Sequence, residues 1–153
     1  MNKFFKVLET NEKVELLQYV VDKLKENPHI KIYVGTDSQN YGGYTHYATA
    51  VVLRYNQRGG HVLYQKTKVA RIRDHWTRLW KECELSLDVA NWLAESSPIK
   101  IEAIELDYNT VKLTESHKLV SATKGYVQSM GFNVKIKPED LIATKAADHI
   151  CRK

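Results

Sequence analysis

The sequence predicts a single α/β domain built on a mixed five-stranded sheet that is flanked by helices. Three observations support this prediction. The 153 residues have the length of one compact domain. Three β-rich segments follow one another before residue 74, and helical and strand patterns alternate after it. We therefore expect residues 1–153 to form one domain, with 1–29 as an N-terminal helical extension.

The first half of the chain predicts a helix followed by an antiparallel meander. Apolar residues recur at helical spacing over 11–26, and Asn27-Pro28 ends that pattern. Segments 30–37, 47–54 and 61–71 are rich in β-branched and aromatic residues, and glycine-containing turns separate them. Short turns between consecutive strands favour antiparallel pairing, so these three segments should form a three-stranded meander.

The second half predicts helices that alternate with strands. Apolar residues recur at helical spacing in three segments. The first covers 74–95, the second begins after a cap at Thr114 and ends before Gly131, and the third covers 143–151. Strand patterns at 99–107 and 132–137 lie between these helices. Because strands joined by helical crossovers pair in parallel, two parallel strands should extend the meander.

Composition excludes several classes of protein. No apolar stretch approaches the roughly 20 residues that span a bilayer, and the first ten residues lack the apolar core of a secretory signal. We therefore expect a cytoplasmic protein without a membrane segment. Cys83 and Cys151 have no C-x-x-C spacing, which indicates neither a disulfide framework nor a zinc site. The net charge of +5 allows a polyanionic partner without proving one.

Four acidic residues come from four separate predicted elements. Asp37 closes the first strand of the meander, Glu82 lies on the long helix, Asp107 closes the fourth strand, and Asp148 lies on the last helix. Glu82 falls on a mostly apolar stripe of its helix, whereas Glu84 falls on a polar stripe. Glu82 is therefore the acid of this helix that we expect to face the sheet.

Carboxylates that converge repel one another unless divalent cations neutralise them. Hard oxygen ligands suit Mg²⁺ or Mn²⁺, and two such ions can hold the attacking water and the leaving oxygen of a phosphodiester. The pattern therefore indicates a two-metal site. Glu105 shares a strand face with Asp107 and could be a ligand itself or orient one.

Each acid also has a structural interpretation. The strand acids could bond the backbone of turns, and Glu82 could pair with a basic neighbour. Asp148 could form an exposed ion pair with Lys145 or Arg152. His149 could assist proton transfer, because an unperturbed imidazole titrates near neutrality.

Positive charge is concentrated in residues 54–81, which contain eight Lys or Arg and a single acid. Tyrosines and tryptophans lie among these cations, a mixture that neutralises phosphates and stacks on bases. The alternative is a strand edge that uses Lys and Arg to prevent aggregation, with tryptophans such as Trp80 in the core. The candidates for nucleic-acid contact are Lys68, Arg71, Arg73 and Arg78.

Six short motifs carry a family resemblance over roughly 30–153. They are G-T-D-S-Q at 35–39, the strand 47–54, E-C-E-L-S-L-D-V-A at 82–90, E-L-D at 105–107, M-G-F-N-V-K-I-K-P at 130–138 and A-A-D at 146–148. In this order the motifs resemble the ribonuclease H-like fold, and more closely the YkuK-type family of predicted ribonuclease H-related nucleases.

The resemblance implies that Asp37, Glu82, Asp107 and Asp148 are the acids of a two-metal site that binds Mg²⁺ or Mn²⁺. The resemblance leaves the substrate open, and we expect hydrolysis of phosphodiester bonds in RNA, an RNA/DNA hybrid or structured, branched DNA. One alternative is a non-cleaving nucleic-acid-binding or assembly module with the same fold. Another is a metal-dependent phosphatase or nucleotide hydrolase, which would not need the basic segment. The sequence predicts neither the oligomeric state nor the exact substrate.

Overall fold

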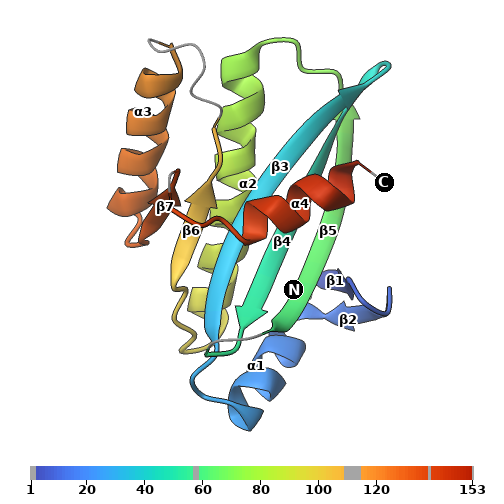
Figure 1. Cartoon of the computed structure of the whole chain (residues 1–153), viewed down its shortest axis with the longest axis vertical. Coiled ribbons are helices and arrows are strands. Elements are labelled where there is room, and N and C mark those ends of the chain that lie inside the picture. Colours follow the sequence, from blue (N-terminus) through green and yellow to red (C-terminus); the bar gives the residue numbers. More distant parts are fainter. Residues whose placement is uncertain (1–2, 57–58, 109–114, 138, 153) are drawn as a thin grey trace.

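The computed structural model describes residues 3–56, 59–108, 115–137 and 139–152, and these form one seven-stranded sheet with four helices (Figure 1). The helices are α1 (Leu16–Glu26), α2 (His75–Ser96), α3 (Glu115–Ser129) and α4 (Ala143–Cys151). The strands are β1 (Phe4–Val7), β2 (Lys13–Glu15), β3 (Lys31–Tyr41), β4 (Tyr44–Arg54), β5 (Gly60–Ala70), β6 (Ala103–Leu106) and β7 (Val134–Ile136).

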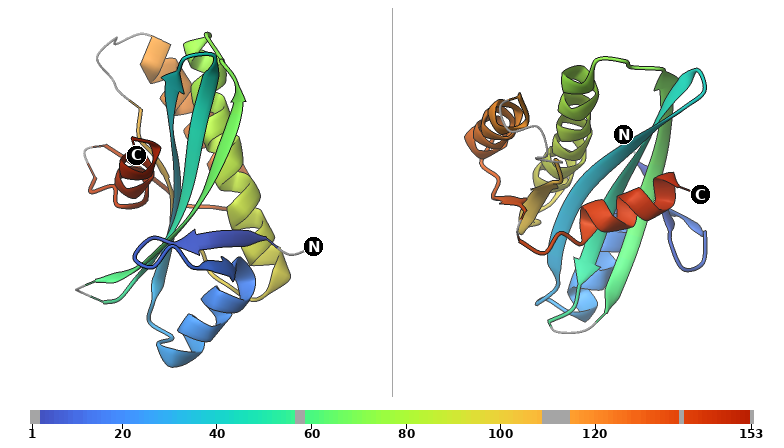
Figure 2. Two further views of the ribbon diagram at one scale, coloured as in Figure 1. Left: turned by 90° about the vertical axis from the view of Figure 1, so that its right-hand side faces the viewer. Right: turned by 45° about the horizontal axis from the view of Figure 1, so that its top comes forward.

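The strand order is β2-β1-β5-β4-β3-β6-β7. Strands β3, β4 and β5 form the predicted antiparallel meander, and β6 and β7 extend it in parallel. Figure 2 shows the sheet nearly edge-on, with α2 on one face and α4 on the opposite face. The mixed α/β fold predicted from the sequence is confirmed. The predicted cap Thr114 lies outside the described residues.

The N-terminal segment differs from the prediction. Residues 11–15 were expected to begin the first helix, but β1 and β2 form a hairpin that pairs with β5, so the sheet has seven strands and not five. Helix α1 begins at Leu16, after Glu15 accepts a hydrogen bond from the Leu17 N–H. Strands of three and four residues are too short to give a clear alternating pattern, which is why this hairpin was missed. Residues 1–29 are therefore not a purely helical extension.

The strands of the central hairpin are longer than the sequence predicted. Strand β3 continues to Tyr41 and turns through Gly42-Gly43 into β4, so that Asp37 pairs with Ala48 inside the hairpin. The prediction that Asp37 closes its strand was therefore wrong. The polar residues after Asp37 hid this continuation, because they do not alternate with apolar residues as a half-buried strand does.

The two faces of the sheet are packed differently. On the α2 face, large side chains from the sheet, α1 and α2 form the main core. On the α4 face the sheet presents small residues, including Ala48 and Ala50, to Ala147 and Ile150 of the helix. Small side chains let α4 lie directly on the strands, which brings the residues of α4 close to those of β3. Both cysteines are buried and free.

Over the described residues, no helix combines the length and apolar character needed to cross a bilayer.

Gly35 marks the closest approach of α4 to the sheet. A Cβ atom at this position would lie 2.8 Å from Thr144 Cγ2 and 2.9 Å from the Thr144 backbone nitrogen. We predict that Gly35→Ala lowers the free energy of unfolding by about 1–3 kcal/mol, because α4 must shift away from β3. Urea denaturation measures this loss. The matched control is Gly43→Ala, because nothing lies within 4 Å of a Cβ there; equal losses for both variants would contradict the prediction.

Candidate active site

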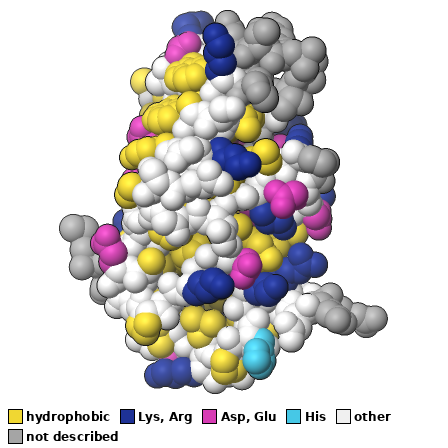
Figure 3. Space-filling view, turned by 90° about the vertical axis from the view of Figure 1, so that its left-hand side faces the viewer, with side chains coloured by type: hydrophobic (Ala, Val, Ile, Leu, Met, Phe, Trp, Pro, Cys, Tyr) yellow, Lys and Arg dark blue, Asp and Glu magenta, His cyan; other side chains and the backbone are white. Residues whose placement is uncertain are grey.

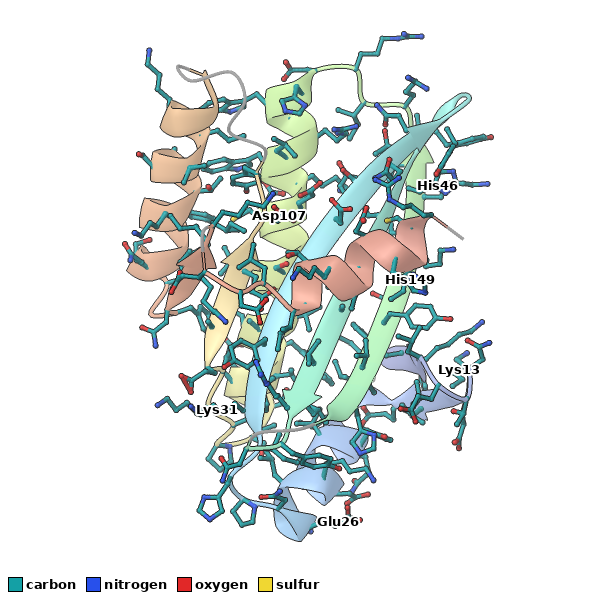
Figure 4. The ribbon with its side chains drawn as sticks, viewed as in Figure 1. Lys13, Glu26, Lys31, His46, Asp107 and His149 are labelled. Carbon is teal, nitrogen blue, oxygen red and sulfur yellow. The ribbon has the colours of Figure 1, made fainter. Side chains whose placement is uncertain are left out.

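The four predicted acids line one pocket. Asp37 comes from β3, Glu82 from α2, Asp107 directly follows β6, and Asp148 comes from α4; the pocket encloses about 330 Å³. Figure 4 shows Asp107 where β6 ends, between the ribbons of α2 and β3. The structure therefore brings together carboxylates that are up to 111 residues apart in the sequence.

The pocket lies where strand β6 ends. Strand β3 pairs with β6 only as far as Gly35, which is opposite Glu105, so the described part of β3 beyond Gly35 has no partner on that side. Continuing the register by two residues places Asp37 beside Asp107. The gap is open to both faces of the sheet, which explains how α2 and α4, on opposite faces, both contribute carboxylates.

Glu82 is the most buried of the four acids, with 4% of its surface exposed, whereas Glu84 is exposed. The helical pattern thus predicted the orientation of Glu82 correctly. The Ser38 hydroxyl donates a hydrogen bond of 2.5 Å to its Oε2 atom. Burial raises the pKa of Glu82 well above its ordinary value of 4.5, and the charge of Asp37 raises it further.

Asp37 and Asp148 are joined by a hydrogen bond between their carboxyl groups. Burial raises the pKa of Asp37 from 3.8 to about 7, and the bond to Asp148 raises it too. Burial also acts to raise the pKa of Asp148, but the bonds from Asp37 and Arg152 outweigh it and lower this pKa. The two shifts have opposite directions, so of the two acids Asp37 is the one that takes up a proton more readily.

Two cations pair with the more exposed acids. Lys137 Nζ lies 2.9 Å from Asp107 Oδ1, and Arg152 Nε donates a 2.9 Å hydrogen bond to Asp148 Oδ1. The ion pair of Asp148 with Arg152 was predicted as an alternative to a role of Asp148 in the site. The structure shows both, because Asp148 pairs with Arg152 and also lines the pocket. Gln39 Nε2 also donates to Asp148 Oδ1, at 3.3 Å.

Glu105 does not line the pocket, although it shares a strand face with Asp107. Its buried carboxylate accepts hydrogen bonds from the backbone N–H groups of Ile142, Ala143 and Thr144, at 3.1, 2.8 and 3.0 Å. Helix α4 has no side-chain cap of its own, so Glu105 satisfies the N–H groups at its start. Glu105 thus positions the helix that carries Asp148, which makes it an orienting residue and not part of the pocket wall.

His149 is exposed and is not among the residues that line the pocket, and its role in proton transfer stays a prediction. Neighbouring residues of a helix point about 100° apart, so Asp148 and His149 face different directions.

Of the four basic candidates, only Arg78 lines the pocket. Its Nε atom is buried and has no hydrogen-bond partner among the described residues. Lys68, Arg71 and Arg73 are exposed and do not line the pocket. The four candidates for nucleic-acid contact therefore do not lie together, because only Arg78 is at the pocket. Arg71 Nη1 donates to the Gly42 carbonyl at 2.7 Å.

The sequence analysis missed several residues of the pocket wall, although patterns for two of them were present. Lys137 follows β7 as Asp107 follows β6, and the register pairs Leu106 with Ile136. His75 lies three residues before Arg78 and seven before Glu82, so it shares their helix face. The remaining missed residues are Ser38, Gln39, Leu79 and Arg152.

The pocket has the ligand chemistry of a divalent-cation site but not a finished coordination sphere. Among the described residues, no three His, Cys, Asp or Glu side chains are gathered closely enough to hold a metal ion. The carboxylates contact Ser38, Lys137 and Arg152 instead. Carboxylate oxygens are ligands that Mg²⁺ and Mn²⁺ accept, so these four side chains are the candidates to hold such an ion.

Comparison with known protein families finds a match to the ribonuclease H-like family over residues 13–152. The matched region includes all four acids and every strand except β1. A search of curated proteins found no match.

We predict that the stability of the metal-free protein decreases as the pH rises from about 4 to about 7. Folding raises the pKa of Asp37 from 3.8 to about 7, so the folded protein holds a proton that the unfolded chain has released. The free energy of unfolding should therefore fall by up to about 1.4 kcal/mol per pH unit for this proton. Urea denaturation in EDTA at several pH values measures the slope. Asp37→Asn should reduce it, and an unchanged slope would contradict the assignment of the proton.

Proposed function

Since the chain belongs to the ribonuclease H-like family, we propose that it is a divalent-metal-dependent nuclease that hydrolyses phosphodiester bonds. The observation that carries this proposal is the convergence of Asp37, Glu82, Asp107 and Asp148 on one pocket. Carboxylates that converge on one pocket repel one another, and divalent cations would relieve that repulsion. The raised pKa values of Asp37 and Glu82 are consistent with that repulsion and with their burial.

In this proposal the four acids hold two Mg²⁺ or Mn²⁺ ions. Such ions lower the pKa of bound water and neutralise charge on a phosphodiester and its leaving oxygen. Asp37 would help to hold both ions, with Glu82 and Asp107 for one and Asp148 for the other. Cation binding would compete with protonation of Asp37, whose pKa is raised, so metal affinity should increase with pH.

Cationic residues of the pocket have proposed roles as well. Arg78 can donate to a phosphate oxygen, because its buried Nε atom has no other partner in the described part of the chain. Lys137 and Arg152 occupy carboxylate oxygens in the metal-free protein and can turn toward a phosphate when cations take their place.

The proposed substrate is a nucleic acid: RNA, an RNA/DNA hybrid or branched DNA. Lys68 on β5 and Arg71 and Arg73 in the β5–α2 connection are exposed beyond the pocket wall. They are proposed to contact backbone phosphates at a distance from the scissile bond.

A non-cleaving nucleic-acid-binding module is the second candidate function. The observation that favours it is the pairing of Lys137 with Asp107 and of Arg152 with Asp148, because these cations neutralise two of the acids without metal. This alternative predicts binding that depends on salt but not on divalent cations.

We predict that Asp37→Asn and Glu82→Gln each reduce metal-dependent cleavage by about 100-fold or more, because each removes a ligand charge without removing bulk. Cleavage of labelled RNA, hybrid, duplex and branched DNA with Mg²⁺, Mn²⁺ or EDTA provides the measurement. Asp88→Asn is the matched control, since Asp88 is an exposed acid on the same helix. Circular dichroism tests whether each variant is folded. Undiminished cleavage by folded Asp37→Asn would refute the metal-site proposal.

We also predict that the double charge reversal of Arg71 and Arg73 to Glu weakens nucleic-acid affinity roughly ten-fold or more and reduces its salt dependence. Turnover of bis(p-nitrophenyl) phosphate should largely survive, because neither residue lines the pocket. The control is the same change at Lys25 and Lys31, which are exposed at the opposite end of the molecule. Equal weakening by both double variants would show that only net charge matters.

A further inference from the structure

Three aromatic side chains form a continuous stack between α2 and α3. The Trp76 and Trp80 rings lie 6.4 Å apart with an angle of 4° between their planes, and Trp80 and Tyr126 lie 5.8 Å apart at 25°. Trp80 is half-buried and packs against the main core, so it holds the stack in place. The two outer rings, Trp76 and Tyr126, are 42% and 43% exposed.

A hollow of about 500 Å³ lies along the part of this stack formed by Trp76 and Trp80, and Tyr126 is not among its lining residues. Trp76, Thr77 and Trp80 line one side, and Ala122 of α3 lines the other. Figure 3, which views the molecule from the side of α3, shows exposed hydrophobic side chains along this face with Lys and Arg around them. Large planar apolar side chains on a surface are costly to leave in water, which indicates that something covers them.

The charges of the hollow favour an uncharged planar ligand. Lys81 and Glu84 both line it, so one cation and one anion face the ligand. Such a lining suits a nucleobase, which has an aromatic face and polar edges, better than a phosphate. One exposed cation, Arg73, precedes Trp76 by three residues and is available to a phosphate that flanks the base.

Helix α2 connects the hollow with the acidic pocket. His75, Arg78 and Glu82 face the pocket, whereas Trp76 and Trp80 face the hollow, so the two sites flank the same part of the helix. An α-helix with its side chains is about 10–12 Å across, which about three stacked nucleotides can span.

We propose that the Trp76–Trp80–Tyr126 stack is a platform for unpaired bases, and that the substrate carries a single-stranded segment beside the bond that is cut. This inference rests on the proposed function, because it specifies the substrate of the same site. Stacking accepts any base, so the platform selects unpaired strands without selecting a sequence. Bases inside a duplex cannot reach the rings, so a fully paired helix gains nothing from the platform.

The test compares the wild type with Trp76→Ala, Trp76→Phe and Phe4→Ala in EDTA, where no cleavage occurs. Phe4 is a matched control, since it is 47% exposed on β1, away from both sites. Fluorescence anisotropy measures binding of labelled oligothymidine, oligouridine and a fully paired duplex. Trp76→Ala should weaken single-strand binding about five-fold or more, and Phe should restore most of it. Duplex affinity should not change, and the two single strands show whether the platform prefers DNA or RNA.

The outcomes separate this inference from the proposed function. Metal-dependent cleavage together with unchanged single-strand affinity in Trp76→Ala would overturn the platform and leave the nuclease intact. Trp76-dependent binding without cleavage on any substrate would support the platform and count against the nuclease. An equal loss for single strand and duplex would overturn the platform. A last outcome would also overturn the platform: Trp76→Ala binds single strands as well as the wild type does, but loses a dimer that the wild type forms in sedimentation. That result would show that the stack binds a second copy of the chain.

Discussion

The buried carboxylate of Glu105 holds α4 against the sheet, and the candidate site depends on that contact. Three backbone N–H groups at the start of α4 point to this one side chain, which comes from β6. Burial raises the pKa of Glu105, and the three N–H donors oppose this effect by favouring the ionised form. An unpaired helix start in the interior would leave several donors without partners, so removing the carboxylate would release the end of α4. Asp148 reaches the pocket because α4 is fixed at this point.

The pocket gathers like charges, and the protein compensates them in different ways. The raised pKa of Asp37 favours its protonated form, Glu82 accepts a short bond from Ser38, and Asp107 and Asp148 pair with Lys137 and Arg152. Each of these interactions is local and reversible, because protons exchange, the Ser38 hydroxyl can rotate and the cationic side chains are flexible. A site compensated in this way remains folded without a ligand and can still exchange its partners for cations. This property is compatible with a metal-dependent enzyme and also with a module that has lost catalysis, and the proposed function rests on the first of these.

The sequence predicted those parts of the fold and site that depend on long patterns. The helical crossovers and the inward orientation of Glu82 follow from helical periodicity, and the three-stranded meander follows from three β-rich segments separated by turn residues. The β1–β2 hairpin was missed because its strands are too short for such a pattern. The sequence also could not show that Arg71 bonds the Gly42 carbonyl, because that contact depends on tertiary packing.

The hairpin also changes how the sheet can associate with other sheets. Its ladder with β5 is formed at Leu63 and Tyr64, and the Leu8 N–H also bonds the Val62 carbonyl, so among the described residues the part of β5 after Tyr64 has no paired strand on the outer side. Lys66 and Lys68 occupy this open stretch, and both are exposed. Lysines on an unpaired strand discourage docking of a second sheet, because the approaching strand would have to strip water from their charges. The outer edge of β5 is thus protected from pairing with another sheet in two ways: one part is hydrogen-bonded to β1, and the unpaired part carries charged lysines.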